Sequence, residues 1–301
     1  MADKTSVSLV LGSGGARGLA HIGVIHWLQE HGYDIASISG CSMGALVGGI
    51  YAAGKMDDYE HWIRAIDKMD VLSYLDLSWR QSGLVKGDKI IDALKELVGD
   101  RKIEDLPIPF TAVASNLKTG KEVWIQSGQL FDAIRASISL PLLVTPYDYK
   151  GASLVDGGVL NPVPIAPTFG DGTDLTIAVS LGGEHEDLKD EDKAEEDEDT
   201  ESEIGASLKE YSSKIKEFVN GLGIIKAGTT RQEISAFEVG LRSFDSMQST
   251  IARQKLAAYP PDVLIELPSN VCQTLDFHRA AFLIDFGYKR AAEKLEHMSR
   301  S

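Results

Sequence analysis

Residues 40–44 read Gly-Cys-Ser-Met-Gly, a Gly-x-Ser-x-Gly pattern that is typical of serine hydrolases. The pattern follows an apolar stretch at 35–39 and precedes a run of small residues, so it falls where a strand turns into a helix. Such a turn strains the backbone and projects the hydroxyl of Ser42 out of the sheet. Gly40 and Gly44 suit the turn, because side chains there would collide with the neighbouring strand and helix. The spacing therefore predicts that Ser42 is the nucleophile of an acyl-ester hydrolase.

A glycine-rich turn, Gly-Ser-Gly-Gly-Ala-Arg-Gly at residues 12–18, follows the first predicted strand. Backbone amides at Gly14 and Gly15 can approach a developing negative charge closely, and the Met43 amide begins the helix after the elbow. These amides are expected to form an oxyanion hole. A dinucleotide-binding loop is the alternative. Arg17 stands where its third glycine would be, and the Gly-Lys-Ser/Thr of a phosphate loop is missing from the turn, so nucleotide binding is disfavoured.

No sequence pattern distinguishes one of the histidines as the base that would activate Ser42. In an ordinary α/β-hydrolase the elbow follows several strands and an acid and a histidine come downstream, whereas here it follows the second predicted strand. The chain has seven histidines, and each is interpreted as an ordinary surface or core residue: His21, His26, His31, His61, His185, His278 and His297. Asp156 is the better base, because it ends an apolar strand and precedes Gly157 and Gly158. A plain turn aspartate is the alternative interpretation.

The segments around these motifs alternate between strand and helix. Apolar and β-branched runs predict strands at Ser6–Leu11, Ile35–Ser39, Phe110–Ser115, Lys121–Gln126, Leu175–Leu181 and Val263–Leu267, with a further strand ending at Asp156. Helical spacing predicts helices at Leu19–His31, Ala45–Ala53, 57–68, 88–98, Leu130–Ser139, 207–220, 230–257 and Phe277–His297. The alternation favours a parallel sheet with helices on its faces.

Most of the net charge of −15 comes from one segment. Residues 184–203 hold thirteen acidic and two basic side chains and supply −11, so the other 281 residues sum to −4. Such a block is usually disordered, because like charges repel and nothing is buried. The nearly balanced remainder has no basic patch, which argues against nucleic acid as a partner and against docking on anionic lipid.

Cysteine usage and hydropathy indicate a cytoplasmic protein. Cys41 and Cys272 cannot build a disulfide framework, and their spacing matches no zinc pattern, so no metal is expected. No stretch reaches the roughly 20 apolar residues that cross a bilayer, and residues 1–10 lack the pattern of a secretory signal.

Three blocks in this order resemble the patatin-like phospholipases: residues 12–18, residues 40–44 and Asp156-Gly157-Gly158. The sequences that continue or flank these blocks also agree with the family, at residues 19–24, 136–141 and 161–164. The resemblance covers about residues 6–182 and, more loosely, the closing helix at Phe277–His297, and it is closest to short, single-domain bacterial members. It implies a three-layer α/β/α fold with a central, mainly parallel sheet. It also implies one hydrolase domain over residues 1–301, with 184–203 as an acidic insertion and 204–301 as a mostly helical C-terminal part.

The resemblance implies a Ser–Asp dyad that works without histidine and without a cofactor. Ser42 is then the nucleophile and Asp156 its base, while amides near Gly14 and Gly15 hold the oxyanion with Met43. The remaining motif residues support these loops: Gly12, Arg17, Gly18, Gly40, Gly44, Gly157 and Gly158. Position 13 is usually glycine in the family and is serine here, which restricts the turn but leaves its amides in place. Arg17 is interpreted as an anchor of the loop, with direct substrate contact as the alternative.

The expected substrate is a fatty acyl ester such as a phospholipid, lysophospholipid or neutral glyceride. An acyl chain needs an apolar groove, which residues 140–144 would line unless they form plain core. The helices within 207–257 would cap the site as a lid, or else belong to the core or to a dimer seam. A lipid substrate would bring the protein into transient contact with a membrane surface.

Three rival functions remain open from the sequence. The same site would serve an acyltransferase that passes the acyl group to an alcohol instead of water. Peptide hydrolysis shares the nucleophile. A catalytically idle scaffold that binds a basic partner through the acidic segment is the third, and the intact Ser42 and Asp156 pair argues against it. Labelling by a fluorophosphonate separates the scaffold from the enzymes.

Overall fold

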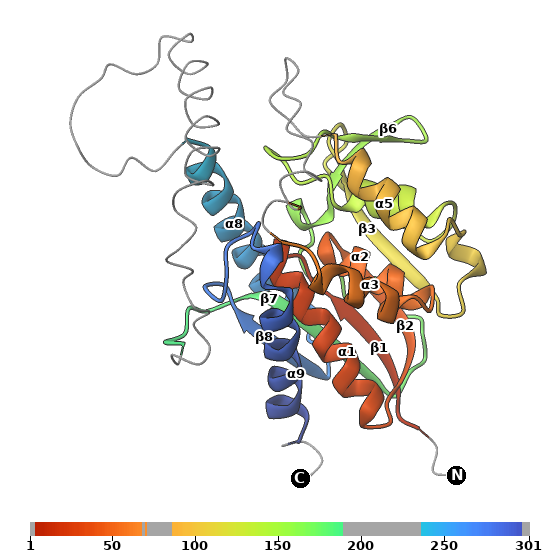
Figure 1. The fold of residues 1–301 in the computed structure, drawn as a ribbon, viewed down its shortest axis with the longest axis vertical. Helices are drawn as coiled ribbons and strands as arrows, with labels where there is room; N and C mark the ends of the chain where they lie inside the picture. Colours follow the sequence, from red (N-terminus) through yellow and green to blue (C-terminus); the bar gives the residue numbers. More distant parts are fainter. Residues whose placement is uncertain (1–3, 68–69, 71–85, 189–235, 297–301) are drawn as a thin grey trace, which may run out of the picture.

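A computed structural model describes residues 4–67, 70, 86–188 and 236–296 of the 301-residue chain (Figure 1). Its strands are β1 Ser6–Leu11, β2 Asp34–Cys41, β3 Phe110–Asn116, β4 Lys121–Ile125, β5 Tyr147–Tyr149, β6 Ala152–Asp156, β7 Leu175–Gly183 and β8 Val263–Pro268. Its α-helices are α1 Ala20–Glu30, α2 Met43–Ala52, α3 Met56–Arg64, α5 Asp88–Val98, α6 Leu130–Ser137, α8 Ala236–Ala258 and α9 Ala280–Glu296. Short 3₁₀ turns are η1 Gly15–Leu19, η2 Ile103–Asp105, η3 Gly157–Val159, η4 Ala166–Thr168 and η7 Phe277–Arg279.

The strands of the described residues form one mixed sheet in the order β5-β6-β3-β2-β1-β7-β8, with β4 also paired to β3. The pairs β1–β2, β1–β7, β2–β3 and β7–β8 are parallel, whereas β3–β4, β3–β6 and β5–β6 are antiparallel. The interior strand β1 is buried along nearly its whole length, as expected of a parallel strand that is covered on both faces. The predicted α/β fold with a mainly parallel sheet is confirmed.

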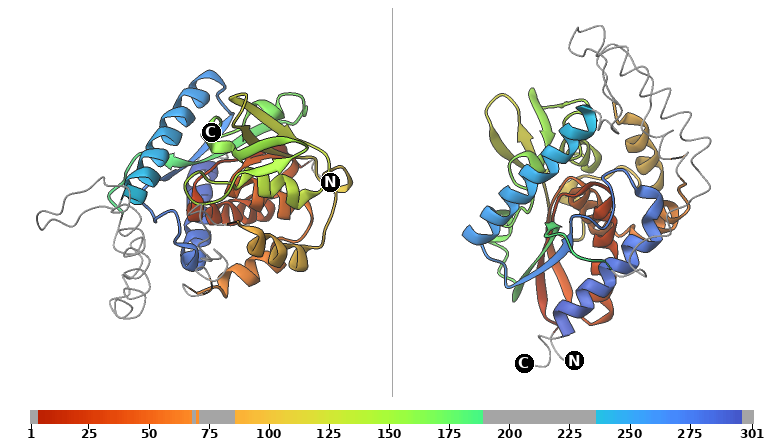
Figure 2. Two further views of the ribbon diagram at one scale, coloured as in Figure 1. Left: turned by 90° about the horizontal axis from the view of Figure 1, so that it is seen from above. Right: turned by 90° about the vertical axis from the view of Figure 1, so that its left-hand side faces the viewer.

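Helices cover the two faces of the sheet unequally. One face carries α1, α2 and α9, with α3, α5 and α6 beside them, and it holds the larger apolar core. The other face is covered by α8 and by the chain between β6 and β7, over a small second cluster. The right-hand view of Figure 2 shows α8 and α9 on opposite sides of the strands. This arrangement makes the three layers that the sequence predicts.

The two strands β2 and β6 meet end to end along one edge of β3. Cys41, the last residue of β2, pairs with Val113, and Asp156, the last residue of β6, pairs with the next residue, Ala114. The opposite edge of β3 is occupied by β4 over residues 112–116. Because β2 and β6 run in opposite directions relative to β3 along the shared edge, their final residues face each other. The residue after Cys41 is Ser42, so the strand tips bring it towards Asp156.

Most predicted elements occur within a few residues of their expected bounds, and one helix is shorter than expected. The helix expected over 57–68 ends at Arg64. The strands β5 and β6 form a hairpin, and its turn residues Lys150 and Gly151 have φ angles of 52° and 80°. Positive φ at both positions matches the right-handed twist of the flanking strands. Residues 189–203 of the acidic segment, the helix expected at 207–220 and the start of the one at 230–257 lie outside the described residues, and the domain boundaries stay a prediction.

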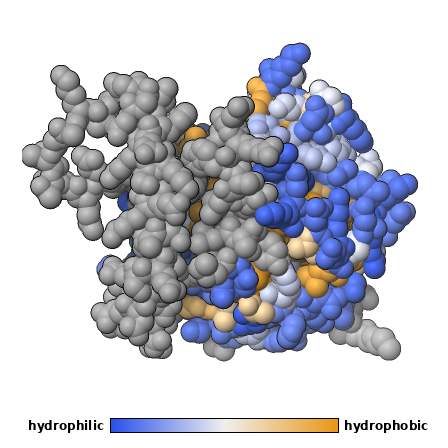
Figure 3. Space-filling view, turned by 45° about the horizontal axis from the view of Figure 1, so that its top comes forward, coloured by the Kyte–Doolittle hydropathy of each residue, from blue (hydrophilic) through white to orange (hydrophobic). Residues whose placement is uncertain are grey.

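The surface of the described residues is mostly hydrophilic on the face drawn in Figure 3, with hydrophobic residues in small patches. Within the described part of the chain, no helix combines the length and apolarity that crossing a membrane requires.

Candidate active site

Ser42 lies in the turn between β2 and α2, in a backbone conformation that residues other than glycine rarely adopt. Its φ and ψ angles are 54° and −127°, and its residue is 7% exposed. A non-glycine residue held in such a region costs of the order of 1–3 kcal/mol, which the surrounding structure must offset. The carbonyl of Ser42 accepts hydrogen bonds from the amides of Ala45 and Leu46, so the turn leads directly into the first turn of α2. This is the geometry of a nucleophile elbow.

The glycines on either side of Ser42 make room for this turn. A Cβ on Gly40 would lie 2.4 Å from the carbonyl oxygen of Gly44. A Cβ on Gly44 would lie 2.0 Å from the carbonyl oxygen of Leu11 at the end of β1. Both distances are far below a permitted contact, so the elbow requires glycine at both positions. The collisions with the following helix and the neighbouring strand are those expected from the sequence.

Ser137 holds the elbow from below, and sequence reasoning gave it no role. Its fully buried hydroxyl donates to the carbonyl of Val113 in β3 at 2.6 Å and accepts from the amide of Ser42 at 2.9 Å. The side chain therefore ties the strained residue to the strand on which β2 and β6 meet. A serine at the end of the helix Leu130–Ser137 carries no local signal of such a contact, although the segment was part of the family resemblance.

Asp156 is fully buried where β6 passes into η3. Its Oδ1 accepts from the amide of Gly158 at 2.7 Å, and its own amide donates to the carbonyl of Ser139 at 3.0 Å. Burial raises the pKa of this carboxyl to about 7, against the lowering effects of the Ser42 hydroxyl and the Gly158 amide. Oδ2 has no hydrogen-bond partner of ordinary geometry among the described residues. The Ser42 hydroxyl lowers the pKa of this carboxyl, although no hydrogen bond of ordinary geometry joins the two side chains.

The glycine-rich turn keeps two of its amides free. The amides of Gly12 and Ser13 donate to the carbonyls of Val179 and Pro162, and the amide of Ala16 donates to that of Thr274. The amides of Gly14 and Gly15 have no partner among the described residues, and neither has that of Met43 at the start of α2. A Cβ on Gly18 would lie 2.3 Å from the Cβ of Met43, so the turn touches the elbow. The three free amides are those that the sequence analysis expects to bind an oxyanion.

His21 supports the glycine-rich turn from the core. It is fully buried on α1, its Nε2 lies 2.9 Å from the carbonyl oxygen of Gly12, and burial lowers its pKa to about 4. Near neutral pH it is uncharged and donates through Nε2. Its hydrogen bond therefore helps to hold the turn.

Arg17 is almost completely buried and is bonded to three neighbouring protein groups. Its guanidinium donates to the carbonyl oxygens of Gly14 and Ser269, at 3.1 and 2.6 Å, and to the carboxylate of Asp245 at 2.8 Å. These contacts match the interpretation of Arg17 as an anchor of the loop.

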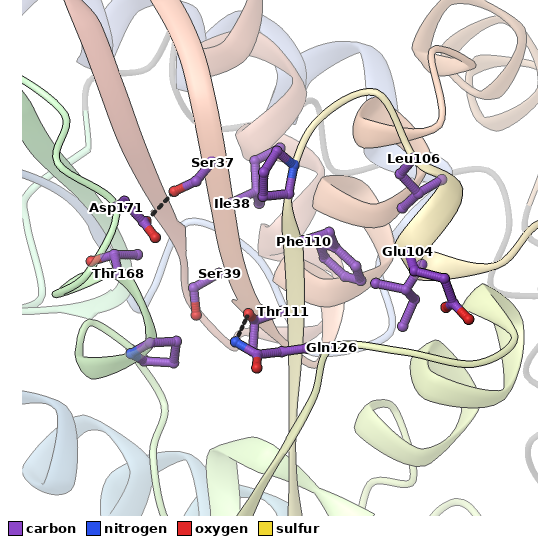
Figure 4. Close-up of a pocket in the computed structure, with 13 residues that line it drawn as sticks. Ser37, Ile38, Ser39, Glu104, Leu106, Phe110, Thr111, Gln126, Thr168 and Asp171 are labelled. Atoms are coloured by element: carbon purple, nitrogen blue, oxygen red, sulfur yellow. Dashed lines mark hydrogen bonds between the residues drawn. The ribbon is translucent and has the colours of Figure 1, made fainter.

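A second serine–aspartate contact occurs on the face of the sheet below α8. Ser8 in β1 donates to Oδ2 of the exposed Asp171 at 3.0 Å, and Ser37 in β2 donates to the same oxygen. The neighbouring cavity has a volume of about 320 Å³ and is lined from β2, β3, residues 103–106 and residues 167–171 (Figure 4). Neither Ser42 nor Asp156 lines this cavity. Hydroxyls that line the cavity bond to neighbouring protein groups. The side-chain amide of Gln126, for example, donates to the hydroxyl of Thr111 (Figure 4).

Residues 140–144 are the segment that the sequence analysis expects to line the acyl groove. Leu142 is 48% exposed with a φ of 72°, whereas Val144 is buried. Leu142 also contacts α8, because a Cβ on Gly240 would lie 2.6 Å from its Cδ1. Within the described residues, no group of three or more His, Cys, Asp or Glu side chains could hold a metal ion.

The comparison with known families decides the classification. A sequence model described as patatin-like phospholipase matches residues 9–169. The chain belongs to the patatin-like phospholipase family. An uncharacterized NTE family protein of Mycobacterium tuberculosis is 41% identical in a match that covers 96% of this chain and 91% of that protein.

More distant relatives of this patatin-like protein have names that state an activity. A lysophospholipase of Aspergillus terreus is 29% identical over 97% of this chain, which spans 18% of that much longer protein. A patatin-like phospholipase domain-containing protein of Caenorhabditis elegans is 36% identical over 59% of this chain and 14% of its own length. The solved structure of VipD from Legionella pneumophila matches with a TM-score of 0.47 and 16% identity, covering 98% of this chain and 67% of that one.

Proposed function

We propose that this protein is a serine acyl hydrolase of the lysophospholipase type, with Ser42 as nucleophile and Asp156 as its base. The observation that supports this most is the meeting of β2 and β6 on one edge of β3, where a strained serine faces a buried carboxylate. The free amides of Gly14, Gly15 and Met43 suit an oxyanion beside Ser42.

The reaction runs through an acyl-enzyme. The Ser42 hydroxyl attacks the ester carbonyl while its proton passes to Asp156, and the amides stabilise the oxyanion. The intermediate collapses, and the leaving alcohol takes the proton from Asp156. Water then attacks the acyl-enzyme and gives its proton to Asp156. The second collapse releases the fatty acid, and Asp156 returns the proton to the Ser42 oxygen.

The raised pKa of Asp156 addresses the main difficulty of a dyad without histidine. A carboxylate with a pKa near 3.9 is a weak base. Burial raises the pKa of Asp156 to about 7, so its ionised form is a stronger base at neutral pH. The neutral His21, bonded to Gly12, is occupied in holding the loop.

A single-chain acyl ester such as a lysophospholipid is the proposed substrate class. The lysophospholipase of Aspergillus terreus has this activity in its name, and the partly exposed Leu142 beside α8 offers an apolar surface for one acyl chain. Transfer of the acyl group to an alcohol would use the same acyl-enzyme.

Activity-based labelling followed by product analysis tests this proposal. A fluorophosphonate should label wild-type protein on Ser42 and leave Ser42→Ala unlabelled. Incubation with lysophosphatidylcholine should release free fatty acid, and added glycerol or a second lysolipid should not divert the acyl group. Labelling at another residue, or acyl transfer exceeding fatty-acid release, would contradict the proposed hydrolase.

A further inference from the structure

The helix α8 contacts the glycine-rich turn through polar side chains, although it lies outside the segment that the family model matches. That segment ends at residue 169, whereas α8 begins at Ala236. Asp245 and Gln248 stand three residues apart on α8, so they share one face of the helix. Both reach the turn at residues 12–18.

Gln248 is bonded to the side chain that replaces the usual glycine of this family. Its Nε2 donates to Ser13 Oγ at 3.1 Å, and the same hydroxyl lies 3.4 Å from its Oε1. Gln248 is 7% exposed and Ser13 is 8% exposed. A buried amide that lost its partner would remain desolvated without a compensating hydrogen bond, so the contact between Gln248 and Ser13 is favoured. Ser13 directly precedes Gly14, whose amide is free.

Asp245 reaches the same turn through Arg17. The ion pair is 2.8 Å long, and the Arg17 side chain is 4% exposed while that of Asp245 is 34% exposed. Arg17 also donates to the carbonyl of Gly14. The peptide unit after Gly14 is therefore held through its carbonyl, and that unit carries the free amide of Gly15.

Gln248 also packs against the turn that holds Asp156. A Cβ on Gly158 would lie 2.1 Å from Gln248 Nε2 and 2.7 Å from Ser13 Oγ. The amide of Gly158 is the donor to Asp156 Oδ1. One side chain of α8 therefore lies against both parts of the site, the glycine-rich turn and the turn after β6.

We propose that α8 positions the oxyanion hole and the base, with Gln248 and Asp245 as positioning residues that act through Ser13, Arg17 and Gly158. This inference rests on the proposed function of Ser42 and Asp156. Gln248, through Ser13, fixes the position of the Gly14 amide. Asp245, through Arg17, fixes the orientation of the Gly15 amide. The family motifs then supply the reacting groups, while a helix from the C-terminal part of the chain sets their alignment.

Three substitutions on α8 separate positioning from packing. Gln248→Met keeps the length of the side chain and removes its hydrogen bonds, and Asp245→Asn removes the charge opposite Arg17. Thr250→Ala is the matched control, because Thr250 is exposed on the same helix and bonds to the carbonyl of Ser246 within it. On a short-chain ester, Gln248→Met should lower kcat about 10-fold and Asp245→Asn about 3-fold, with KM changed less than about 2-fold. Thr250→Ala should match wild type.

Coupling between the two partners gives a second readout. Ser13→Ala should lower kcat about as much as Gln248→Met does. The double variant should be no slower than the slower single variant, because each substitution already breaks the same contact. Losses that multiply would show two independent effects and would overturn the pairing.

Amide hydrogen exchange of residues 12–18 decides the inference without using activity. In Gln248→Met this peptide should exchange at least about 5-fold faster than in wild type, while peptides from α9 exchange at the same rate. Unchanged exchange at 12–18 overturns the inference, whatever happens to kcat. A fall in kcat that only follows a loss of folded protein also overturns it. If wild-type protein hydrolyses no ester and takes no fluorophosphonate, the proposed function fails, and exchange still shows whether α8 holds the turn.

Discussion

Ser42 and Ser8 both lie close to an aspartate, but Ser42 stands in a strained turn at the tip of β2, whereas Ser8 lies inside β1. The partners differ as well. Asp156 is fully buried, and its Oδ2 has no hydrogen-bond partner in the described ranges, while Asp171 is exposed and accepts from two serine hydroxyls. The amides around Ser8 are used in pairing with β2 and β7. Those of Gly14, Gly15 and Met43, near Ser42, have no partner within the part of the chain that the structure describes.

Proximity of a hydroxyl to a carboxylate does not by itself make that hydroxyl a nucleophile. Catalysis needs a carboxylate whose pKa is high enough for it to accept a proton from the hydroxyl. It also needs hydrogen-bond donors for the negative charge that appears on the substrate. At the contact of Ser8 with Asp171 the carboxylate is exposed and accepts from two hydroxyls, and the neighbouring amides are used in the sheet. This contact fixes the chain after η4 against the sheet.

The largest expected effect separates the two serines directly. Ser42→Ala should lower kcat on a short-chain ester by at least about 10⁴-fold, because no covalent intermediate can form. Ser8→Ala should keep at least about half of the wild-type kcat. Steady-state kinetics on matched preparations measures both, with circular dichroism as the check on folding. Activity that survives in Ser42→Ala and disappears in Ser8→Ala would reverse the assignment.

Replacing the two aspartates should have opposite consequences for stability. Asp156→Asn should lower kcat by about 10³-fold and raise the free energy of unfolding at pH 8 by about 1–3 kcal/mol. The reason is that a buried carboxyl with its pKa raised from 3.8 to about 7 opposes folding once ionised, by at most about 4 kcal/mol. Asp171→Asn removes an acceptor of two hydroxyls and should lower stability by about 1 kcal/mol. Urea unfolding at pH 8 tests the pair, and equal signs would refute it.

The pH dependence of the reaction should carry the signature of Asp156. The base works when ionised, so kcat/KM should fall about 10-fold for each pH unit below about 7. Stability has the opposite dependence. The folded state binds a proton at Asp156 that the unfolded state has lost between pH 4 and 7, so this group's contribution to stability decreases as pH rises through that range. A kcat/KM that stays constant down to pH 5 would rule out Asp156 as the base.

The smallest expected effect concerns the support of the elbow. Ser137→Ala removes the acceptor for the Ser42 amide and should lower kcat about 5- to 20-fold while costing about 1–2 kcal/mol of stability. Ser139→Ala is a control in the same segment, because its hydroxyl bonds to Arg135 and not to Ser42. It should change kcat less than about 3-fold. If the two variants lose kcat equally, the contact of Ser137 with Ser42 has no special role.

Sequence reasoning reached the parts of the molecule whose requirements are local. Glycine at positions 40 and 44 follows from the sterics of one tight turn, and the alternation of strands and helices follows from hydropathy. Asp156 needed more, because nothing local to it distinguishes a base from a turn aspartate, and the family resemblance supplied the choice. Ser137 and Gln248 were missed, since their roles depend on contacts that only the folded sheet creates. A buried glutamine on a long helix is indistinguishable by sequence from a solvated one.

The end-to-end meeting of β2 and β6 has a consequence for how the protein matures during synthesis. The elbow is complete by residue 52, but β6 ends at residue 156 and α8 at residue 258. Contacts of such long sequence separation form late, so we expect the nucleophile to be built before its base and its aligning helix arrive. Pulse labelling with a fluorophosphonate during refolding should therefore lag behind the burial of Trp27, which is 3% exposed in the folded protein. A serine that becomes reactive only after its base and α8 are in place would not hydrolyse esters in the cell while the chain is still incompletely folded.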